Sequence, residues 1–210
     1  MVGLAEDNGV RAAALLTGMD APLGRTAGNA LEVREALEVL EGGGPADVVE
    51  VTLALAHEML ALAGVDADPA AALSDGRAMD RWRRLIRAQG GDPDATLPVA
   101  KESHVVNAPE SGTLTRLDAM AVGLAAWRLG AGRARKEDPV QAGAGIVWHA
   151  RPGDNVAEGQ PLFTLLTDEP ERFDRALASL EGGYDIDGAT GDGVVGGAFT
   201  PQALIIDRIS

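Results

Sequence analysis

Residues 104–114 have the sequence His104-Val-Val-Asn-Ala-Pro-Glu-Ser-Gly-Thr-Leu114. Two short apolar runs flank the group from Pro109 to Gly112, and proline and glycine are residues that favour tight turns. The stretch therefore predicts a strand, a turn and a returning strand. It is the first half of a pattern that has a counterpart farther along the chain.

The second half of the pattern lies between residues 144 and 166. The apolar run Ala144-Gly-Ile-Val-Trp-His149 predicts a strand, and Arg151-Pro-Gly-Asp154 predicts the turn that follows it. The run Leu162-Phe-Thr-Leu-Leu166 predicts another strand. Two strand-forming segments, each broken by a turn with proline and glycine, thus make up the C-terminal part of the sequence.

The two halves resemble the barrel-sandwich hybrid of biotinyl and lipoyl carrier domains, through Ala-Pro-x-x-Gly at 108–112 and Pro-Gly-Asp-x-Val-x-x-Gly-x-Pro-Leu at 152–162. A carrier attaches its cofactor to a lysine at the tip of the hairpin that joins the halves. Here a helix over Ala119–Leu129 joins them, capped by Asp118 and ended by Gly130. Lys136 lies in Arg-Ala-Arg-Lys-Glu-Asp, so we predict a structural module with an unmodified lysine; a non-catalytic carrier-like or binding module is the alternative.

The first ninety residues predict helices and one strand. The apolar run over Arg11–Thr17 is typical of a buried parallel strand. Asn29 is predicted to cap a helix over Ala30–Glu41, with Glu32 as its capping-box partner. Gly42–Pro45 separates that helix from a second one.

The second predicted helix has Asp47 as its cap, and a third covers Asp75–Ala88. Two glycines and a proline over Gly90–Pro93 end the third helix and mark a domain boundary. His57 and the adjacent Glu58 lie on the second helix. Because no further ligand sits at helical spacing, we predict ordinary helix residues there and no metal or acid–base site.

Charge and composition narrow the function classes. The 210 residues include 32 acidic and 18 basic side chains, a net charge of −14, and no cysteine. Nucleic acid and anionic membranes need clustered cations, so we expect neither as a partner. The absence of cysteine removes disulfides and zinc–thiolate sites. No stretch approaches a membrane span and the first residues do not resemble a signal peptide, so we expect a cytoplasmic protein.

One block of sequence identifies a family. Thr17-Gly-Met-Asp-Ala-Pro-Leu-Gly24 followed by Gly28-Asn-Ala-Leu-Glu-Val-Arg-Glu-Ala36 resembles the Thr-x-Met-x-x-Pro-Leu-Gly and Gly-Asn-Ala-Leu-Glu-Val-x-Glu-Ala block of the thymidine and pyrimidine-nucleoside phosphorylases. Further similar segments follow in order, up to Leu204-Ile-Ile-Asp-Arg-Ile209. The resemblance covers essentially the whole chain. A related phosphoribosyltransferase shares the general architecture but is not expected to have the block at 28–36.

The resemblance implies a fold and an activity. Residues 1–91 would be the remainder of a large α/β domain, and residues 92–210 an α+β domain like the barrel-sandwich hybrid. The family's complete enzymes are expected to be homodimers that use phosphate as co-substrate. They convert thymidine reversibly to thymine and 2-deoxy-α-D-ribose 1-phosphate. The resemblance does not decide between thymidine and uridine.

The family's phosphate loop, Lys-His-Ser-x-Gly-Gly-Val-Gly-Asp, and its Arg…Ser…Lys set on the base do not occur in this sequence. Family members carry roughly half of their length before the position that matches Met1. The glycine runs at Gly42–Gly44, Gly130–Gly132 and Gly191–Gly197 have no Lys or Ser at their exit, so we predict loops there. We therefore expect no catalytic residue in this chain, and no activity from the 210 residues alone.

Two family sites do transfer to positions of this sequence. The family binds a potassium ion through carbonyls of the Pro-Leu-Gly segment and a glutamate of the next helix. The resemblance therefore implies the carbonyl oxygens of Leu23 and Thr26 and the carboxylate of Glu35 as ligands; the alternative is a solvated Glu35 and a purely structural turn. It also implies that the loop Gly130–Asp138 helps to close the substrate cleft, and an ordinary solvated connection is the alternative.

Overall fold

The computed structural model describes residues 1–188 and 203–210, so the run Gly191–Gly197 lies outside the described residues. The chain forms two compact units. We call them the helical unit (Met1–Gly18, Ala36–Ala95 and Gln202–Ser210) and the sheet unit (Met19–Glu35 and Thr96–Pro201). The units interleave along the sequence, unlike the contiguous division into 1–91 and 92–210 that we expected.

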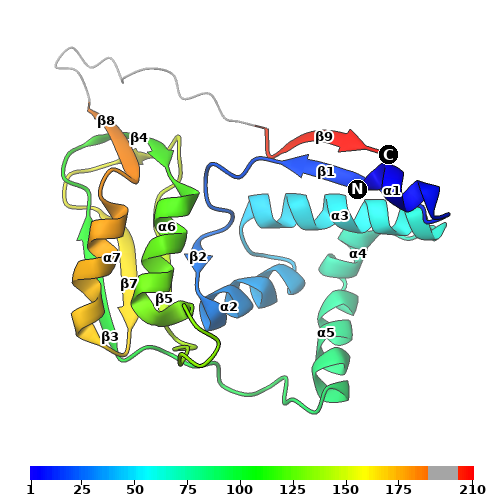
Figure 1. Cartoon of the computed structure of the whole chain (residues 1–210), viewed down its shortest axis with the longest axis horizontal. Helices are drawn as coiled ribbons and strands as arrows, with labels where there is room; N and C mark the ends of the chain where they lie inside the picture. Colours follow the sequence, from blue (N-terminus) through cyan, green and yellow to red (C-terminus); the bar gives the residue numbers. More distant parts are fainter. Residues whose placement is uncertain (189–202) are drawn as a thin grey trace. The chain divides into compact units, whose positions relative to one another are not determined.

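Four complete helices, the end of the helix Asn29–Leu40 (α2) and one strand pair make up the described helical unit (Figure 1). The helices are α1 (Val2–Asp7), α3 (Ala46–Ala63), α4 (Pro69–Ser74) and α5 (Arg77–Ala88). The helix predicted over Asp75–Ala88 is confirmed, since α5 begins two residues later and ends at the same residue. The second predicted helix is confirmed as α3, but Asp47 is not its cap, because the helix already begins at Ala46 after Pro45 and Asp47 lies in its first turn. Gly64 ends α3 with a φ of +68°, the left-handed conformation that glycine adopts without strain.

The strand pair of the helical unit differs from the sequence prediction. Strand β1 (Ala14–Thr17) pairs antiparallel with β9 (Ile205–Ile209), with Ala14 opposite Ile209 (Figure 1). The prediction of a buried parallel strand over Arg11–Thr17 is therefore wrong in both respects, because β1 is only half-buried. A short apolar run indicates a strand but carries no information about its partner, and the partner here lies about 190 residues later.

Two antiparallel sheets form the sheet unit. One has the order β2-β5-β7-β3 and the other the order β6-β4-β8. Their bounds are Thr26–Ala27 (β2), Glu102–Asn107 (β3), Gly112–Leu117 (β4), Gly145–Trp148 (β5), Asn155–Val156 (β6), Pro161–Thr167 (β7) and Tyr184–Gly188 (β8). The predicted strands in the regions of β3, β4, β5 and β7 are confirmed.

The partners of β3 and β4 differ from the sequence prediction, which had them pair with each other. The turn after Asn107 does not fold β3 back onto β4; instead β3 pairs with β7, and β4 pairs with β6 and β8. Thr113 at the start of β4 faces Asp187 near the end of β8. Each half of the sequence pattern thus contributes to both sheets. The described strands form an α+β arrangement without a closed barrel.

Two helices pack beside the sheets, α6 (Ala119–Ala126) and α7 (Phe173–Leu180) (Figure 1). The Asp118 cap is confirmed, since its Oδ1 accepts a hydrogen bond from the Ala121 amide at 2.8 Å. The predicted helix to Leu129 changes at Trp127 into a wide turn that runs to Ala131. Gly130, at φ +108°, makes that turn possible.

The hydrophobic core lies in the sheet unit. Its fully buried side chains include Leu114, Leu129, Ile146, Phe163 and Leu165, each at most 1% exposed. Helix α2 (Asn29–Leu40) begins where Gly28 and Gly145 bring two backbones together. A Cβ on Gly145 would lie 2.3 Å from the Ala27 carbonyl oxygen, so this approach requires glycine. Among the described residues, no helix is long and apolar enough to cross a membrane.

Candidate functional site

Glu35 is buried on α2, with 7% of its surface exposed. Its Oε2 accepts a hydrogen bond from the Arg25 amide at 2.8 Å, and the Arg25 Nε lies 3.8 Å from the same oxygen. The alternative of a solvated helix residue is therefore wrong. The carboxylate is fixed against the turn that connects Pro22 to β2.

Leu23 lies in that turn together with Gly24, which is buried and has a φ of +79°, and Thr26 is the first residue of β2. The Arg25 carbonyl accepts a hydrogen bond from the Trp148 amide at 3.0 Å. Carbonyls alternate in direction along a strand, so the Thr26 carbonyl points away from β5. Since β2 is the last strand of its sheet, this oxygen lies on the side of β2 that pairs with no other strand of that sheet. The Thr26 hydroxyl is itself buried without a partner.

No group of three or more His, Asp or Glu side chains suited to a metal occurs in the described ranges 1–188 and 203–210. The potassium site that we expected is of another kind, since two of its three ligands are backbone carbonyls. The structure places Glu35 beside Arg25, the residue that precedes Thr26, and Leu23 lies two residues before Arg25.

The N-terminus of α2 is attached to the wide turn after α6. The Asn29 side-chain amide donates to the Ala131 carbonyl at 2.7 Å, and the Ala30 amide donates to the Ala142 carbonyl at 3.0 Å. Asn29 is thus not the predicted helix cap. The Glu32 carboxylate instead accepts a hydrogen bond from the Gly28 amide at 2.8 Å, so the capping interaction moves one residue toward the N-terminus.

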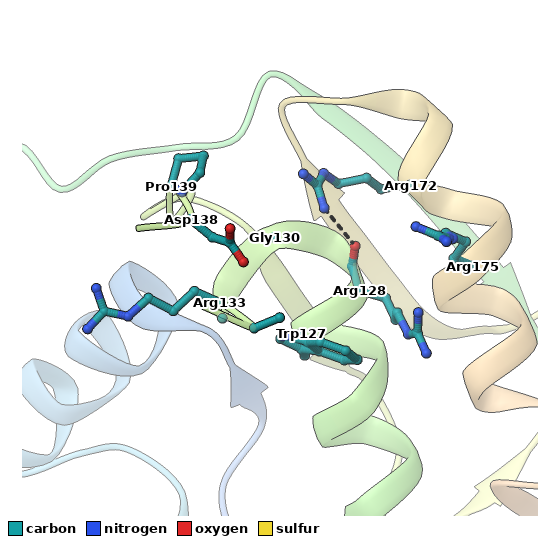
Figure 2. A pocket seen from close by; sticks show the side chains of 10 residues that line it. Trp127, Arg128, Gly130, Arg133, Asp138, Pro139, Arg172 and Arg175 are labelled. Carbon is teal, nitrogen blue, oxygen red and sulfur yellow. Dashed lines mark hydrogen bonds between the residues drawn. The ribbon is translucent and has the colours of Figure 1, made fainter. Parts of the chain in front are cut away.

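The wide turn borders a pocket of about 330 Å³ in the sheet unit (Figure 2). Four guanidinium groups and one carboxylate are among its lining side chains. Its walls are formed by Trp127, Arg128, Gly130, Gly132, Arg133, Ala134, Asp138, Pro139, Arg172 and Arg175.

The loop Gly130–Asp138 forms one wall of this pocket. It holds its shape through local contacts, since Arg133 donates to the Lys136 carbonyl at 3.0 Å and the Asp138 carboxylate accepts from the Arg135 amide at 2.8 Å. Lys136 is exposed within this loop. A carrier lysine would stand at the tip of a hairpin between two strands, whereas this loop joins a helical turn to β5.

The sequence analysis did not identify Arg172 and Arg175 as site residues. They lie at the start of α7, and Figure 2 shows both projecting toward the turn with Arg128 and Gly130. Arg172 donates to the Glu169 carboxylate at 2.6 Å, and its other contact is the Arg128 carbonyl at 3.5 Å. Their spacing of three residues on one helix was visible, but no motif linked them to the distant Arg128.

Glu58 on α3 has a structural partner. Arg208 of β9 donates two hydrogen bonds to its carboxylate, at 2.6 and 2.9 Å. These bonds lower the pKa of Glu58 and raise that of Arg208. The prediction that His57 and Glu58 are not a metal or acid–base pair is consistent with this ion pair, which joins a helix to the last strand.

Comparison with known proteins places the chain in a family. Residues 113–187 match the pyrimidine nucleoside phosphorylase C-terminal domain. A thymidine phosphorylase of Mycobacterium tuberculosis (strain H37Rv) is 58% identical over 212 residues, which cover 100% of this chain and 47% of the relative. The chain belongs to the thymidine and pyrimidine-nucleoside phosphorylase family.

More distant members agree with this assignment. The pyrimidine-nucleoside phosphorylase of Bacillus subtilis (strain 168) is 36% identical over 192 residues, 86% of this chain and 44% of the relative. That of Staphylococcus epidermidis (strain ATCC 12228) is 34% identical over 199 residues, 89% of this chain and 46% of the relative. The chain spans about half the length of the curated relatives it matches.

Proposed function

We propose that this protein takes part in the reversible phosphorolysis of a pyrimidine nucleoside. In the thymidine reaction the bond between the base nitrogen and the anomeric carbon breaks, and a phosphate oxygen forms the new bond at that carbon. The products are thymine and 2-deoxy-α-D-ribose 1-phosphate. The observation that carries the proposal is the 58% identity to a thymidine phosphorylase along the whole chain. Nucleoside and phosphate are then its substrates.

A chimera tests this proposal directly. The matching part of the Mycobacterium tuberculosis relative would be replaced by the 210 residues of this chain, behind the relative's own remaining sequence. We expect phosphate-dependent release of thymine from thymidine, measured by chromatography. A folded chimera without phosphorolysis, beside an active parent enzyme prepared in the same way, would refute the proposal.

The 210 residues alone are expected to be inactive. Phosphorolysis needs a cradle of backbone amides and a cation around phosphate, and the family's phosphate loop does not occur in this sequence. Thymine release above the level of a heat-treated sample would contradict this expectation. Such a result would not affect the chimera experiment, which tests the family activity.

We further propose that Leu23, Thr26 and Glu35 contribute oxygen ligands to a potassium ion. The residues fit such an ion, because a buried carboxylate lies beside the turn that leads into β2, and the Thr26 carbonyl is on the side of β2 that pairs with no other strand of its sheet. Alkali cations prefer oxygen ligands of this kind. The half-exposed Arg25 is the competitor for the Glu35 carboxylate, at 3.8 Å. When bound, the ion would supply positive charge close to the phosphate.

Thermal unfolding of the 210-residue chain tests the potassium proposal without an activity assay. Potassium should raise the melting temperature relative to equal ionic strength of a large organic cation. Glu35→Gln should remove that difference, whereas Glu38→Gln on the same helix should leave it intact. A potassium effect equal in both variants would argue against Glu35 as a ligand.

The remaining family features complete the proposal. We propose a cytoplasmic homodimer in which the C-terminal region has the barrel-sandwich hybrid fold. The loop Gly130–Asp138 would help to close the substrate cleft, and its support is the glycines at 130 and 132, which permit movement. Sedimentation of the chimera tests the dimer, because a monomeric active species would contradict it.

A further inference from the structure

The arginine-lined pocket has a charge that its own contacts do not neutralise. Four arginines and Asp138 line it, and Glu169 pairs with Arg172 from outside the lining set. Positive charge is left in surplus even when both acids are counted. The whole chain carries a net charge of −14, so the surplus is local.

Three of the four guanidinium groups lack an acidic partner among the described residues, and one of them, Arg133, donates to the Lys136 carbonyl. Arg175 is exposed on α7 and forms no ion pair there. Arg128 lies over the Trp127 ring, with its guanidinium carbon 4.6 Å from the ring centroid. This contact orients the group and leaves its charge in place.

The two walls of the pocket differ in their arginines. Figure 2 shows Arg172 and Arg175 projecting toward the turn with Arg128, while Arg133 projects to the other side. Arg172 is held by Glu169 and by the Arg128 carbonyl, so its position is set before any ligand arrives. The positively charged guanidinium groups of one pocket repel each other, and a bound anion would offset that repulsion.

We propose that this pocket binds the phosphate group of a small molecule, through Arg128, Arg172 and Arg175. A phosphate is a tetrahedral dianion that accepts hydrogen bonds from several guanidinium groups at once, whereas a planar carboxylate has two oxygens and one charge. The volume of about 330 Å³ suits a small ligand. A nucleic acid is disfavoured because the acidic chain repels a polyanion.

Two classes of small molecule carry the phosphate group that this pocket would bind: free phosphate and the phosphate monoester of a sugar. One face of Trp127 is covered by Arg128, and a Cβ on Gly132 would lie 2.8 Å from the ring. An aromatic base therefore has little of the ring available for stacking. The pocket would bind a phosphate group whether or not the protein carries out phosphorolysis.

The test is a titration of the 210-residue chain with orthophosphate, ribose 5-phosphate and uncharged ribose, followed by calorimetry and amide NMR spectra. We expect saturable binding of both phosphate compounds, with the largest shifts in residues 128–133 and 172–175, and no binding of ribose. The ratio of the two affinities shows whether the sugar contributes. Shifts confined to other residues, or equal binding of ribose, would overturn the proposal.

Matched charge variants localise the effect. Arg175→Gln and Arg128→Gln should each weaken phosphate binding about ten-fold, the loss of one charge-assisted interaction. Arg81→Gln removes the same charge from an exposed position on α5 and should leave binding within two-fold. Circular dichroism verifies that the variants are folded. Equal weakening in all three would mean general charge attraction and would refute a defined site.

Discussion

The two compact units differ in what happens to their apolar side chains. In the sheet unit, residues from both sheets and from α6 and α7 form one buried core. In the helical unit, the eighteen residues of α3 include none that are buried, and Met59 is 70% exposed. Both units are rich in apolar residues, so composition does not explain the difference. In the sheet unit, strands that are distant in the sequence pair and enclose a core. An apolar helix can bury its side chains only when another surface packs against it.

Hydrogen exchange should show the largest contrast between the units. Amides of β5 and β7 should exchange about ten-thousand-fold more slowly than those of α3, since core strands open only with global unfolding. That ratio corresponds to ~5.5 kcal/mol. Limited proteolysis should likewise spare residues after Leu97 and cut within residues 1–90. Uniform protection across a monodisperse monomer would remove the contrast.

A pair of truncations would sharpen the same comparison. Phe163→Ala removes a side chain that is 1% exposed in the sheet core, and it should lower the free energy of unfolding by about 3–5 kcal/mol. Met59→Ala removes a large apolar side chain from the exposed face of α3 and should change it by less than about 0.5 kcal/mol. Urea unfolding measures both. A large loss in Met59→Ala would mean that α3 is covered in solution.

Two glycines offer a smaller contrast. Gly145→Ala should cost about 2–4 kcal/mol, because its Cβ would meet the Ala27 carbonyl oxygen at 2.3 Å and one of two touching backbones must move. Gly64→Ala, at the end of α3, meets nothing within 4 Å and should cost only about 1 kcal/mol for its left-handed φ. Thermal unfolding measures the loss of stability in both variants. Similar losses would show that the backbone around Gly145 accommodates the added Cβ at little cost in free energy.

The smallest effect concerns the exposed ion pair of the helical unit. Arg208 holds the pKa of Glu58 below its usual value of 4.5, chiefly through its hydrogen bonds. A lowered carboxyl pKa stabilises the folded state at neutral pH, and the contribution is lost as the pH falls through the folded-state pKa. Glu58→Gln should therefore reduce exchange protection of β9 at pH 7, and the reduction should shrink as the pH falls through the folded-state pKa of Glu58. Glu50→Gln on the same helix is the control and should show no such difference.

The sequence predicted local structure well and long-range partners poorly. The ends of α3 and α5 follow from glycine and proline, and the Asp118 cap follows from its position before an apolar run. The same information cannot choose the partner of β1 or separate β3 from β4, because many pairings satisfy one hydrophobic pattern. Local rules placed Asn29 as a cap, and a contact with Ala131, 102 residues away, displaced it.

The candidate sites divide in the same way. Leu23, Thr26 and Glu35 were found through a contiguous family block, and their neighbourhood is fixed by one helix and one turn. The arginine pocket had no contiguous signal. Arg128 and Arg175 are 47 positions apart, and only the packing of α7 beside the wide turn places both on one pocket.

The pairing of Thr113 with Asp187 has a consequence for how this region can be handled as a module. These two residues are also the limits of the segment that matches the family's C-terminal domain. The chain therefore enters and leaves that segment at neighbouring positions on adjacent strands. Such a geometry suits circular permutation and insertion into a host protein, since a short linker can join the two ends without stretching either strand.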